Sequence, residues 1–533
     1  MEKGLIIDYI LTCPAQDAEE QAEAVALEQS VELPRNAVKD PEVAGSSIPD
    51  ILALIPLCEL PDGLVRYRLR IAFSSILVGR DIPQFFNLLF GNVSLKRGLL
   101  IEDMTLPEEI LALFPGPGYG IEGIRKASEV RSGALLCSVL KPVGISCDGL
   151  ARMAGKFAKA GVPFIKDDHG IADQETCPFA RRVREVQRAI KRSGSGSIYL
   201  PNITGPHEEL EERIAVAVNE GVKGFLVSPF LIGLDCFRSL REKYPVLWMA
   251  HPAFSGAFFA DKLHGFRPGL LLGTILRLLG ADMVIYPDAG GRFTFTPEEC
   301  MNIAKGLRDD YKGKFKPAMP VPAGGISLSK AAHVREFYGE DVMLLIGGSI
   351  YLHKKGLEKA TRELLEILSQ TIPMKDSGRW PDKKGLPCIE DESERSSPAC
   401  RGGIIKHAGS GAWHGIDKIP YKKDDTHYES ITRTELFIPE QGKAGFDVRY
   451  FEIAPGSNSS FETHSHIHLV IGARGTGEVR IDNQWHELSP KDIAFIPPNT
   501  PHQLRNPGPD HFGFYCIVDH VRDKPTLLNN KSE

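Results

Sequence analysis

Between residues 131 and 370, short apolar runs alternate with longer amphipathic stretches at a regular spacing. The runs are "ALLCSVL" (134–140), "PFI" (163–165), "SIYLPN" (197–202), "GFLVS" (224–228), "VLWMAH" (246–251), "DMVIYP" (282–287), "MPVPAGG" (319–325) and "VMLLIGG" (342–348). Their lengths are typical of buried strands, whereas stretches such as "DGLARMAGKFAKAG" have the period of an amphipathic helix. Strand–helix units repeated in this way predict a (β/α)8 barrel, with a doubly wound open parallel sheet as the alternative.

The two flanks of this region have different patterns. Residues 1–130 mix helical periods with Pro and Gly breaks, which predicts a separate α+β domain. Residues 371–404 are polar and rich in Ser, Pro and charge, the composition of a linker. From 405 to 533 short strands are separated by Gly, Asn and Pro turns, which predicts an all-β barrel or jelly roll. The expected fold class is therefore α/β, followed by a smaller all-β domain.

Composition adds few constraints. The chain has 533 residues, a net charge of −6 and 42% apolar residues, which gives no basis for binding nucleic acid or an anionic membrane. The first residues lack the layout of a signal peptide, and no apolar run has the ~18–20 residues that span a bilayer. No CxxC occurs among the ten cysteines, and Cys137 and Cys516 lie in apolar runs, where buried reduced thiols are expected. These features predict a cytoplasmic enzyme.

Polar residues gather where the predicted barrel strands end, which is where barrels of this kind place their active sites. Alone, each of these residues is compatible with an ordinary loop or core position. Together they occupy six of the eight strand ends: Lys141 after the first, "KDDH" (166–169) after the second, "PNITGP" (201–206) after the third, His251 after the fifth, and "AGG" (323–325) and "GG" (347–348) after the last two.

These residue types suggest a particular chemistry. Paired glycines allow backbone N–H groups to approach an anion, so Gly324, Gly325, Gly347 and Gly348 predict a phosphate site. Asp168 with neighbouring oxygen or imidazole ligands suits Mg²⁺. A metal-bound carbonyl makes the adjacent C–H more acidic, and a partly desolvated lysine can act as the base. The site therefore predicts a phosphorylated sugar that reacts through an enolate.

The same residues also carry a family resemblance. The segments "SVLKPVGIS", "GVPFIKDDHG", "WMAHPAF", "PAGGIS" and "LLIGGS", in this order, resemble the ribulose bisphosphate carboxylase (RuBisCO) large-subunit superfamily. The resemblance covers about residues 5–370 and includes "AVALEQSVE" and "FGNVSL" near the N-terminus. It implies an α/β N-terminal domain, a barrel, and a homodimer or higher even oligomer whose active site lies at the subunit interface.

The resemblance also implies residue roles. Lys166 would be carbamylated and would hold Mg²⁺ together with Asp168, and His169 would stand at the position of the last metal ligand. The other implied roles are the acid/base lysine (Lys141), a histidine near the substrate hydroxyls (His251), two residues from the partner subunit (Glu28 and Asn92), and the phosphate cradle (Gly324, Gly325, Gly347 and Gly348).

Four departures from the carboxylase pattern matter for function. His169 replaces a glutamate, Val143 replaces a second lysine, and Pro252 replaces a phosphate-binding arginine. The loop "PDAGGRF" lacks the lysine that steadies CO₂, and its only cation is Arg292. The resemblance therefore implies a protein that does not fix CO₂ but retains the enolisation chemistry.

A second group of candidate ligands lies in the C-terminal domain. "FETHSHIHLVIGARGTGEV" and "KDIAFIPPNTPHQLRN" resemble the two motifs of a cupin. In a strand, His464, His466 and His468 would project from one face, and His502 follows in the second motif. We expect an all-histidine site for Mn, Fe, Ni, Cu or Zn, in which two of Glu462, His464 and His466 complete the set. The alternative is a chance run of surface histidines.

The combined resemblance implies an activity for each part. A RuBisCO-like barrel that isomerises 5-methylthioribulose 1-phosphate would be fused to a cupin that removes the methylthio group, with a thiol as co-substrate, to leave deoxyxylulose 5-phosphate. Fusion would raise the local concentration of the shared intermediate. Two alternatives for the barrel are a diketo-methylthiopentyl phosphate enolase and a decarboxylase of an oxo-sugar acid phosphate of the apiose type. The cupin would then be a sugar isomerase or a ligand sensor.

Overall fold

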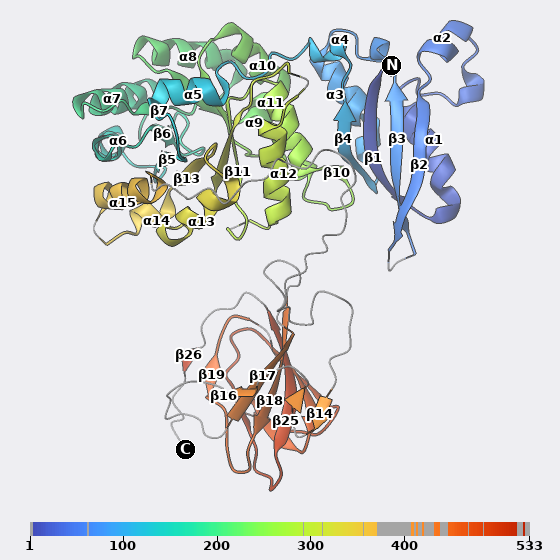
Figure 1. Cartoon of the computed structure of the whole chain (residues 1–533), viewed down its shortest axis with the longest axis vertical. Coiled ribbons are helices and arrows are strands. Elements are labelled where there is room, and N and C mark those ends of the chain that lie inside the picture. Colours follow the sequence, from blue (N-terminus) through green and yellow to red (C-terminus); the bar gives the residue numbers. More distant parts are fainter. Residues whose placement is uncertain are drawn as a thin grey trace. The chain divides into compact units, whose positions relative to one another are not determined.

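The computed structural model describes residues 4–60, 63–291, 293–311, 313–354, 356–369, 446–466, 468–482 and 484–518, with the backbone of five further strand segments and of residue 519. The chain forms two compact units, residues 1–377 and 378–533 (Figure 1). The predicted linker, 371–404, lies outside the described residues. Among the residues that are described, no helix is both long enough and apolar enough to cross a membrane.

The first unit begins with a five-stranded sheet. Its strands, in spatial order, are β10 (Gly265–Phe266), β4 (Leu99–Thr105), β1 (Leu5–Cys13), β3 (Val65–Phe73) and β2 (Asp50–Glu59). Two helices beside this sheet contribute to its apolar core, α1 (Ala18–Glu28) and α3 (Ile82–Phe90). The short strand β10 comes from the middle of the predicted barrel region and pairs in parallel with β4. The α+β fold predicted for the N-terminal part is confirmed, and the barrel segment completes its sheet.

Eight parallel strands follow and form a barrel. In spatial order they are β7 (Ile198–Leu200), β6 (Phe164–Asp167), β5 (Leu135–Leu140), β13 (Met343–Ile346), β12 (Met319–Ala323), β11 (Met283–Pro287), β9 (Leu247–Ala250) and β8 (Gly224–Val227). A parallel bridge between Asn202 and Leu226 joins the two ends of this order. Because the ring closes, the predicted (β/α)8 barrel is confirmed and the open sheet is excluded.

Helices cover the outside of the barrel (Figure 1). They are α6 (Cys147–Ala160), α7 (Phe179–Arg192), α8 (Leu210–Asn219), α10 (Leu234–Lys243), the π-helix η7 (Gly269–Ile275) with α11 (Leu276–Leu278), α12 (Pro297–Arg308), α13 (Leu328–Tyr338) and α15 (Leu357–Ser369). Helix α6 illustrates why the sequence folds this way. The Ser146 hydroxyl caps its first turn by accepting the Gly149 N–H at 3.3 Å, and Gly161 ends it with a φ of 92°.

Side chains of alternate strand residues fill the barrel interior, as the period of two requires. Phe164 belongs to the interior cluster, whereas Ile165 packs outward against the helices. At the amino-terminal end of the strands, Asp282 accepts the Tyr119 and Gly120 N–H groups at 2.7 and 2.9 Å, which fixes the start of α5 (Gly120–Ser128) beneath the barrel. The carboxyl ends of the strands carry the candidate site.

The second unit is all-β, as predicted. One antiparallel sheet contains β16 (Lys418–Pro420), β17 (Ile431–Phe437), β18 (Phe446–Ile453), β25 (Phe512–Asp519), β20 (His468–Arg474) and β23 (Ile493–Ile496). The other contains β22 (Gln484–Leu488), β21 (Gly477–Ile481), β24 (His502–Arg505), β19 (Glu462–Thr463) and β26 (Thr526–Leu527), and a hairpin joins β14 (His407–Gly409) to β15 (Ala412–Trp413). Residues from both main sheets, among them Val470 and Leu504, form its apolar core.

The cysteines differ in part from the expectation. Cys137 and Cys516 are buried, as predicted, and neither forms a disulfide with another described cysteine. Cys147 and Cys177, however, form a disulfide within the barrel unit. Their separation of 30 residues gave no recognisable spacing in the sequence.

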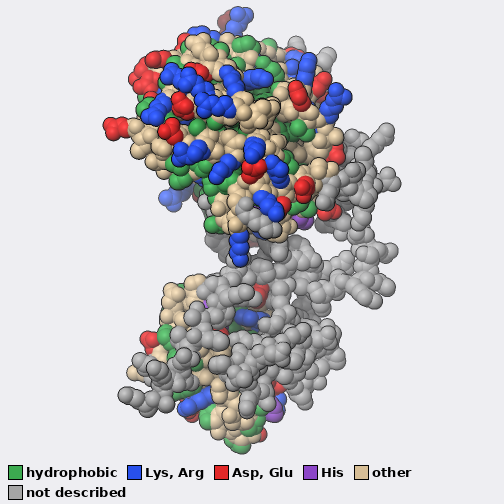
Figure 2. Space-filling model, turned by 90° about the vertical axis from the view of Figure 1, so that its left-hand side faces the viewer, with side chains coloured by type: hydrophobic (Ala, Val, Ile, Leu, Met, Phe, Trp, Pro, Cys, Tyr) green, Lys and Arg blue, Asp and Glu red, His purple; other side chains and the backbone are tan. Residues whose placement is uncertain are grey.

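On the face of the first unit seen in Figure 2, acidic and basic side chains are interspersed rather than gathered by sign.

Candidate active site and metal centre

Lys166 is the most deeply placed member of the barrel site. It lies on β6, is 2% exposed, and its Nζ donates to the backbone oxygen of Asp167 at 3.0 Å. Burial lowers the pKa of Lys166, because an ammonium group loses its hydration inside the barrel. A lowered pKa makes the neutral amine more available, and only the neutral amine can react with CO₂ to form a carbamate.

Asp168 joins Lys166 to the residues around the barrel mouth. One of its carboxylate oxygens lies 3.1 Å from Lys141 Nζ, and the other lies 3.2 Å from His169 Nδ1. Burial alone would raise the pKa of Asp168, but the Gly170 N–H and the Lys141 and Lys166 cations hold it below its ordinary value. Asp168 is therefore an anionic group at neutral pH, as a metal ligand must be.

His251 faces the same group from the end of β9. Its ring stacks on the His169 ring with centroids 4.3 Å apart, and its Nδ1 accepts the Ala253 N–H at 3.1 Å. Burial first, and then the nearby Lys166 charge, lower the pKa of His251 well below its usual value. His251 is thus a neutral imidazole with its proton on Nε2, which suits hydrogen bonding to a substrate hydroxyl.

The adjacent Asp167 has a different task. It points out of the barrel, is fully buried, and lies 3.0 Å from the guanidinium of Arg182. Tyr199 Oη and the Asn202 N–H also donate to its carboxylate, at 2.7 and 3.0 Å. Asn202 in turn donates to the backbone oxygen of His169 at 3.0 Å. These buried partners hold the loop that carries Asp168 and His169, and sequence reasoning noticed only the segment around Asn202.

The glycine loops lie at the ends of β12 and β13. Gly324 and Gly325 have φ angles of 86° and 93°, a conformation that side chains disfavour. A Cβ on Gly347 would lie 2.6 Å from Val139 and 3.8 Å from Lys141 Cε, so this loop borders Lys141. The geometry is consistent with the predicted phosphate cradle, and phosphate binding by these glycines stays a prediction.

The remaining residues predicted for the barrel site stay predictions, and the structure shows where some of them lie. Glu28 and Asn92 lie together, with Asn92 Nδ2 donating to Glu28 Oε1 at 3.0 Å. Helix α1, which ends at Glu28, lies on the N-terminal sheet away from the barrel of its own chain (Figure 1). That placement is compatible with a contribution to a partner's site, which stays a prediction. Val143 is 48% exposed, and Arg292 lies outside the described residues.

The donor set fits a divalent cation under one condition. With an unmodified Lys166, two lysines face a single carboxylate, and a cation would be repelled. A carbamate on Lys166 would reverse its charge and supply an oxygen ligand beside Asp168. His169, half-exposed at the edge of the group, offers imidazole nitrogen rather than the oxygen that Mg²⁺ prefers.

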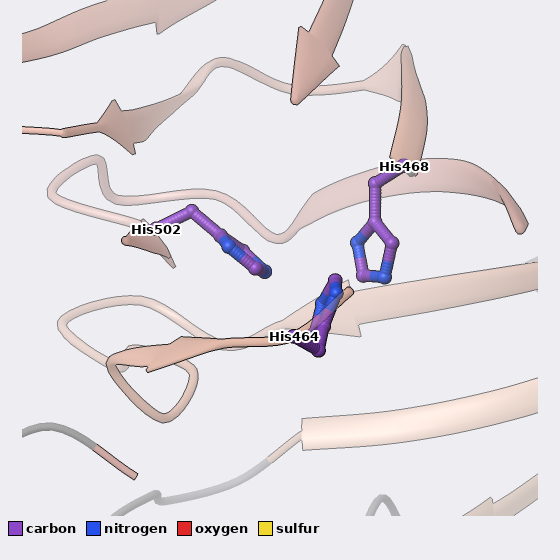
Figure 3. A group of neighbouring side chains, drawn as sticks. All are labelled: His464, His468 and His502. Carbon is purple, nitrogen blue, oxygen red and sulfur yellow. The ribbon is translucent and has the colours of Figure 1, made fainter. Parts of the chain in front are cut away.

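Three histidines converge inside the C-terminal domain. His464, His468 and His502 place one ring nitrogen each within 4.8 Å of one another, and they point toward a common centre from separate segments (Figure 3). His464 Nδ1 lies 3.0 Å from the backbone oxygen of His466, and His502 Nδ1 lies 2.9 Å from that of Thr500. Donation from both Nδ1 atoms leaves both Nε2 atoms unprotonated, as metal ligands require.

The chemistry of this cluster fits a transition metal. His464 Nε2 is buried and has no hydrogen-bond partner among the described residues, which is costly unless a ligand completes it. Burial first, and then the neighbouring imidazoles, lower the pKa of His468 to about 2. Burial also lowers the pKa of His464 and His502. All three side chains are therefore neutral imidazoles that can donate a lone pair.

Of the three residues between which the sequence could not choose, one lies in the described cluster. His464 joins the cluster, whereas Glu462 accepts a hydrogen bond from Ser460 Oγ at 2.6 Å. His466 stacks on His464 with centroids 3.6 Å apart, and its Nε2 lies 3.3 Å from that of His468. The prediction of one continuous strand here is wrong, because His464 and His466 lie between β19 and β20. Metal binding by these residues stays a prediction.

Cys516 is a neighbour of this cluster that sequence reasoning did not include. Its Sγ lies 3.8 Å from His468 Nδ1, and the side chain is buried on β25. The residue was expected to be an ordinary core thiol, because it lies in the apolar run "FGFYCIV". No local signal places it near the histidines, since the contact depends on the pairing of β25 with β20.

Comparisons with known proteins match both units. Residues 120–370 match the ribulose bisphosphate carboxylase large chain, catalytic domain, and residues 449–518 match the cupin domain. Ribulose bisphosphate carboxylase-like protein 1 of Rhodopseudomonas palustris is 36% identical over 69% of this chain and 99% of that protein. The chain belongs to the RuBisCO-like protein family. The family predicted from its strand-end motifs is thereby confirmed.

Two further similarities concern the RuBisCO-like unit. The 5-methylthioribulose-1-phosphate isomerase of Rhodospirillum rubrum is 35% identical over 68% of this chain and 95% of that protein. The crystal structure of a RuBisCO-like protein from Rhodopseudomonas palustris superimposes with a TM-score of 0.62 at 33% identity, over 70% of this chain and all of that one. Both similarities cover a share of the chain that matches the size of the first unit.

Proposed function

We propose that the RuBisCO-like unit isomerises 5-methylthioribulose 1-phosphate, and that the cupin removes the methylthio group from the product to give deoxyxylulose 5-phosphate. The predicted N-terminal domain (1–130) and barrel (131–370) would act together as one catalytic part in a cytoplasmic homodimer, joined by the 371–404 linker to the cupin. The observation that carries the proposal is the Lys141–Asp168 pair beside buried Lys166 and neutral His251. The similarity to a named isomerase supports the choice of substrate.

The barrel residues divide the work of moving a proton between sugar carbons. The glycine loops would bind the phosphate through backbone N–H groups, which orients the carbonyl toward Asp168 and Lys166. Lys141 Nζ would take the proton from C3 and return it to C2, and a second transfer from C4 to C3 would complete the move of the carbonyl from C2 to C4. His251 Nε2 would donate to a substrate hydroxyl and fix its position. When bound, Mg²⁺ would supply positive charge for the oxygen of the enolate.

Two departures from the carboxylase pattern support a reaction without CO₂ fixation. Val143 and Pro252 carry no charge where the resemblance implies a lysine and an arginine. Neither position supplies a cation, and the arginine missing at Pro252 is the one that a second phosphate would need. A methylthio group is uncharged and therefore needs no cationic ligand in that place.

The cupin would act on the isomerised sugar. An external thiolate would take the methylthio group as a mixed disulfide, and the carbon that loses sulfur would gain a proton, so that electrons and atoms balance. When bound, a transition metal would polarise the sugar carbonyl or bind sulfur. The neutral His464, His468 and His502 side chains are the residues that would hold it.

Phosphorus NMR of the full-length chain tests the proposal. With 5-methylthioribulose 1-phosphate, Mg²⁺ and bicarbonate, we expect new resonances from methylthio-pentulose 5-phosphates. Adding a dithiol and Mn²⁺ should convert them to deoxyxylulose 5-phosphate. Lys141→Ala should abolish the first step, whereas Lys159→Ala, a change at a 67% exposed side chain away from the site, should leave it intact.

Each failure of this experiment has a distinct meaning. An unchanged spectrum with 5-methylthioribulose 1-phosphate would refute the isomerase assignment, and turnover of the diketo-methylthiopentyl phosphate instead would identify an enolase. Persistent methylthioxylulose phosphate in the presence of dithiol and metal would refute the cupin step alone.

A further inference from the structure

One covalent link joins the two loops that carry the barrel site. Cys147 is the first residue of α6, just after the loop that follows β5 and contains Lys141. Cys177 lies in the loop that follows β6 and contains Asp168 and His169. The disulfide therefore connects the same two loops that the Lys141–Asp168 ion pair connects.

The Cys177 end of this link is also held to β6. Arg182 Nη1 donates to the backbone oxygen of Cys177 at 3.2 Å, and Arg182 Nε lies 3.0 Å from Asp167, the neighbour of Asp168. Within the same loop, Gln174 Nε2 donates to the backbone oxygen of Gly170 at 2.8 Å. A displacement of Cys177 would therefore be passed to Asp168 through Arg182 and Asp167.

The Cys147 end leads as directly to the other half of the site. Five residues separate Cys147 from Lys141, and Val143 is one of them. Val143 lies close to Gly170 in the opposite loop, since a Cβ added to Gly170 would be 3.2 Å from Val143 Cγ2. The two loops thus approach each other beside Lys141 and Asp168, and the disulfide is a second link between them. The glycine cradle belongs to other strands, β12 and β13, and is not part of this contact.

We propose that the Cys147–Cys177 disulfide is a redox-sensitive positioning element: closed, it holds Lys141 and Asp168 at the spacing the barrel reaction needs, and opened by a dithiol, it lets the two loops separate and activity fall. The inference rests on the proposed function of the barrel. Both sulfurs are buried, with residue exposures of 1% and 3%, so the loop must move before a thiol can reach them. In a reducing compartment, the fraction of such disulfides that is closed depends on the ratio of oxidised to reduced thiols around them.

The chemistry of opening is a pair of thiol–disulfide exchanges. A thiolate of the dithiol attacks one Sγ, the other cysteine leaves as a thiolate, and a mixed disulfide forms. The second thiol of the reagent then displaces the first sulfur. The dithiol leaves as a cyclic disulfide, and two electrons and two protons have passed to the two cysteines.

The test compares the oxidised full-length chain, the same protein after prolonged dithiothreitol treatment and removal of the reagent, and the reoxidised protein. Peptide mass mapping should find the Cys147–Cys177 link before reduction and after reoxidation. We expect reduction to lower kcat by about tenfold to a hundredfold, the range for a misplaced catalytic group. The Mg²⁺ concentration for half-maximal activity should rise, while KM for the sugar phosphate should stay within about twofold, because the glycine cradle is untouched.

Variants separate this link from the other thiols. Cys147→Ser/Cys177→Ser should behave like the reduced protein and show no further response to dithiothreitol. Cys236→Ser, a change at a partly exposed cysteine outside the disulfide, should respond like the unmodified chain. If the double variant fails to fold, the reduction–reoxidation cycle still decides the question.

Three outcomes would overturn the proposal: no Cys147–Cys177 peptide after oxidation, full kcat with an unchanged Mg²⁺ requirement after reduction, or a loss that reoxidation does not reverse. If the oxidised chain does not isomerise the sugar phosphate at all, the proposed function fails. Calorimetric Mg²⁺ binding with bicarbonate then tests the link alone, and equal affinity before and after reduction would contradict it.

Discussion

Asp167 and Asp168 are adjacent in the sequence, but we predict that neutralising them has different effects. Asp167→Asn should lower the stability of the first unit, whereas Asp168→Asn should abolish activity and leave stability nearly unchanged. Asp167→Asn preserves the shape of the side chain but leaves the fully buried Arg182 guanidinium without its anion. Breaking a buried ion pair from one side costs about 3–5 kcal/mol, because the other charge stays buried and uncompensated. The amide also turns a donor toward at least one of the Tyr199 hydroxyl and the Asn202 N–H, which now donate to the carboxylate. Asp167→Asn should therefore destabilise the first unit by about 3–5 kcal/mol.

Urea denaturation of the full-length chain measures this loss. The far-ultraviolet helical signal reports the first unit, since every described helix lies in it. With an m value of about 4 kcal/mol/M, suited to a unit of this size, the midpoint should fall by about 1 M.

Asp168→Asn is the matched control for this experiment. Its ion-pair partner Lys141 is 36% exposed, so stability should change by less than about 1 kcal/mol while activity is lost. Equal midpoints for Asp167→Asn and the unmodified chain would refute the assignment of the two roles. So would an Asp168→Asn protein that is as unstable as Asp167→Asn.

Three further predictions concern single groups. Because burial lowers the pKa of Lys166, its neutral amine forms at a lower pH than that of an exposed lysine, and activation by CO₂ should rise with pH and level off below about 10.4; a rise that continues past that pH would contradict this. His464→Ala should remove most cupin metal, measured by elemental analysis, whereas the exposed His486→Ala should retain it; equal metal contents would refute the centre. Gly325→Ala, at a φ of 93°, should cost about 1–2 kcal/mol of phosphate binding, seen as a raised KM; an unchanged KM would remove this glycine from the cradle.

The barrel was predictable because its signal is repeated. Each of the eight apolar runs became a strand within a few residues of its expected place, and a single misread run would not have hidden the rhythm. The histidine cluster was predictable in composition for a similar reason, since two motifs pointed to it. Its geometry was not, because His464 and His466 lie outside the strand that the alternation suggested.

Other features depend on contacts that no local pattern records. In the sequence, Asp167 and Asp168 look equivalent, and only the fold shows that Asp167 pairs with buried Arg182 whereas Asp168 lies beside Lys141. The Cys147–Cys177 link and the approach of Cys516 to His468 likewise join segments far apart in the chain. Sequence spacing carries no information about such pairs, because tertiary packing alone brings them together.

The two-residue strand β10 has a consequence for how the protein can be made and divided. It completes the edge of the first sheet by pairing with Leu100 and Ile101, although some 165 residues of chain lie between them. During synthesis, β4 must therefore present an unpaired edge until the middle of the barrel has left the ribosome. A fragment cut at residue 130 would retain this exposed edge permanently and would be prone to associate with other copies of itself. The boundary that the sequence pattern suggests is not a place where the chain can be separated.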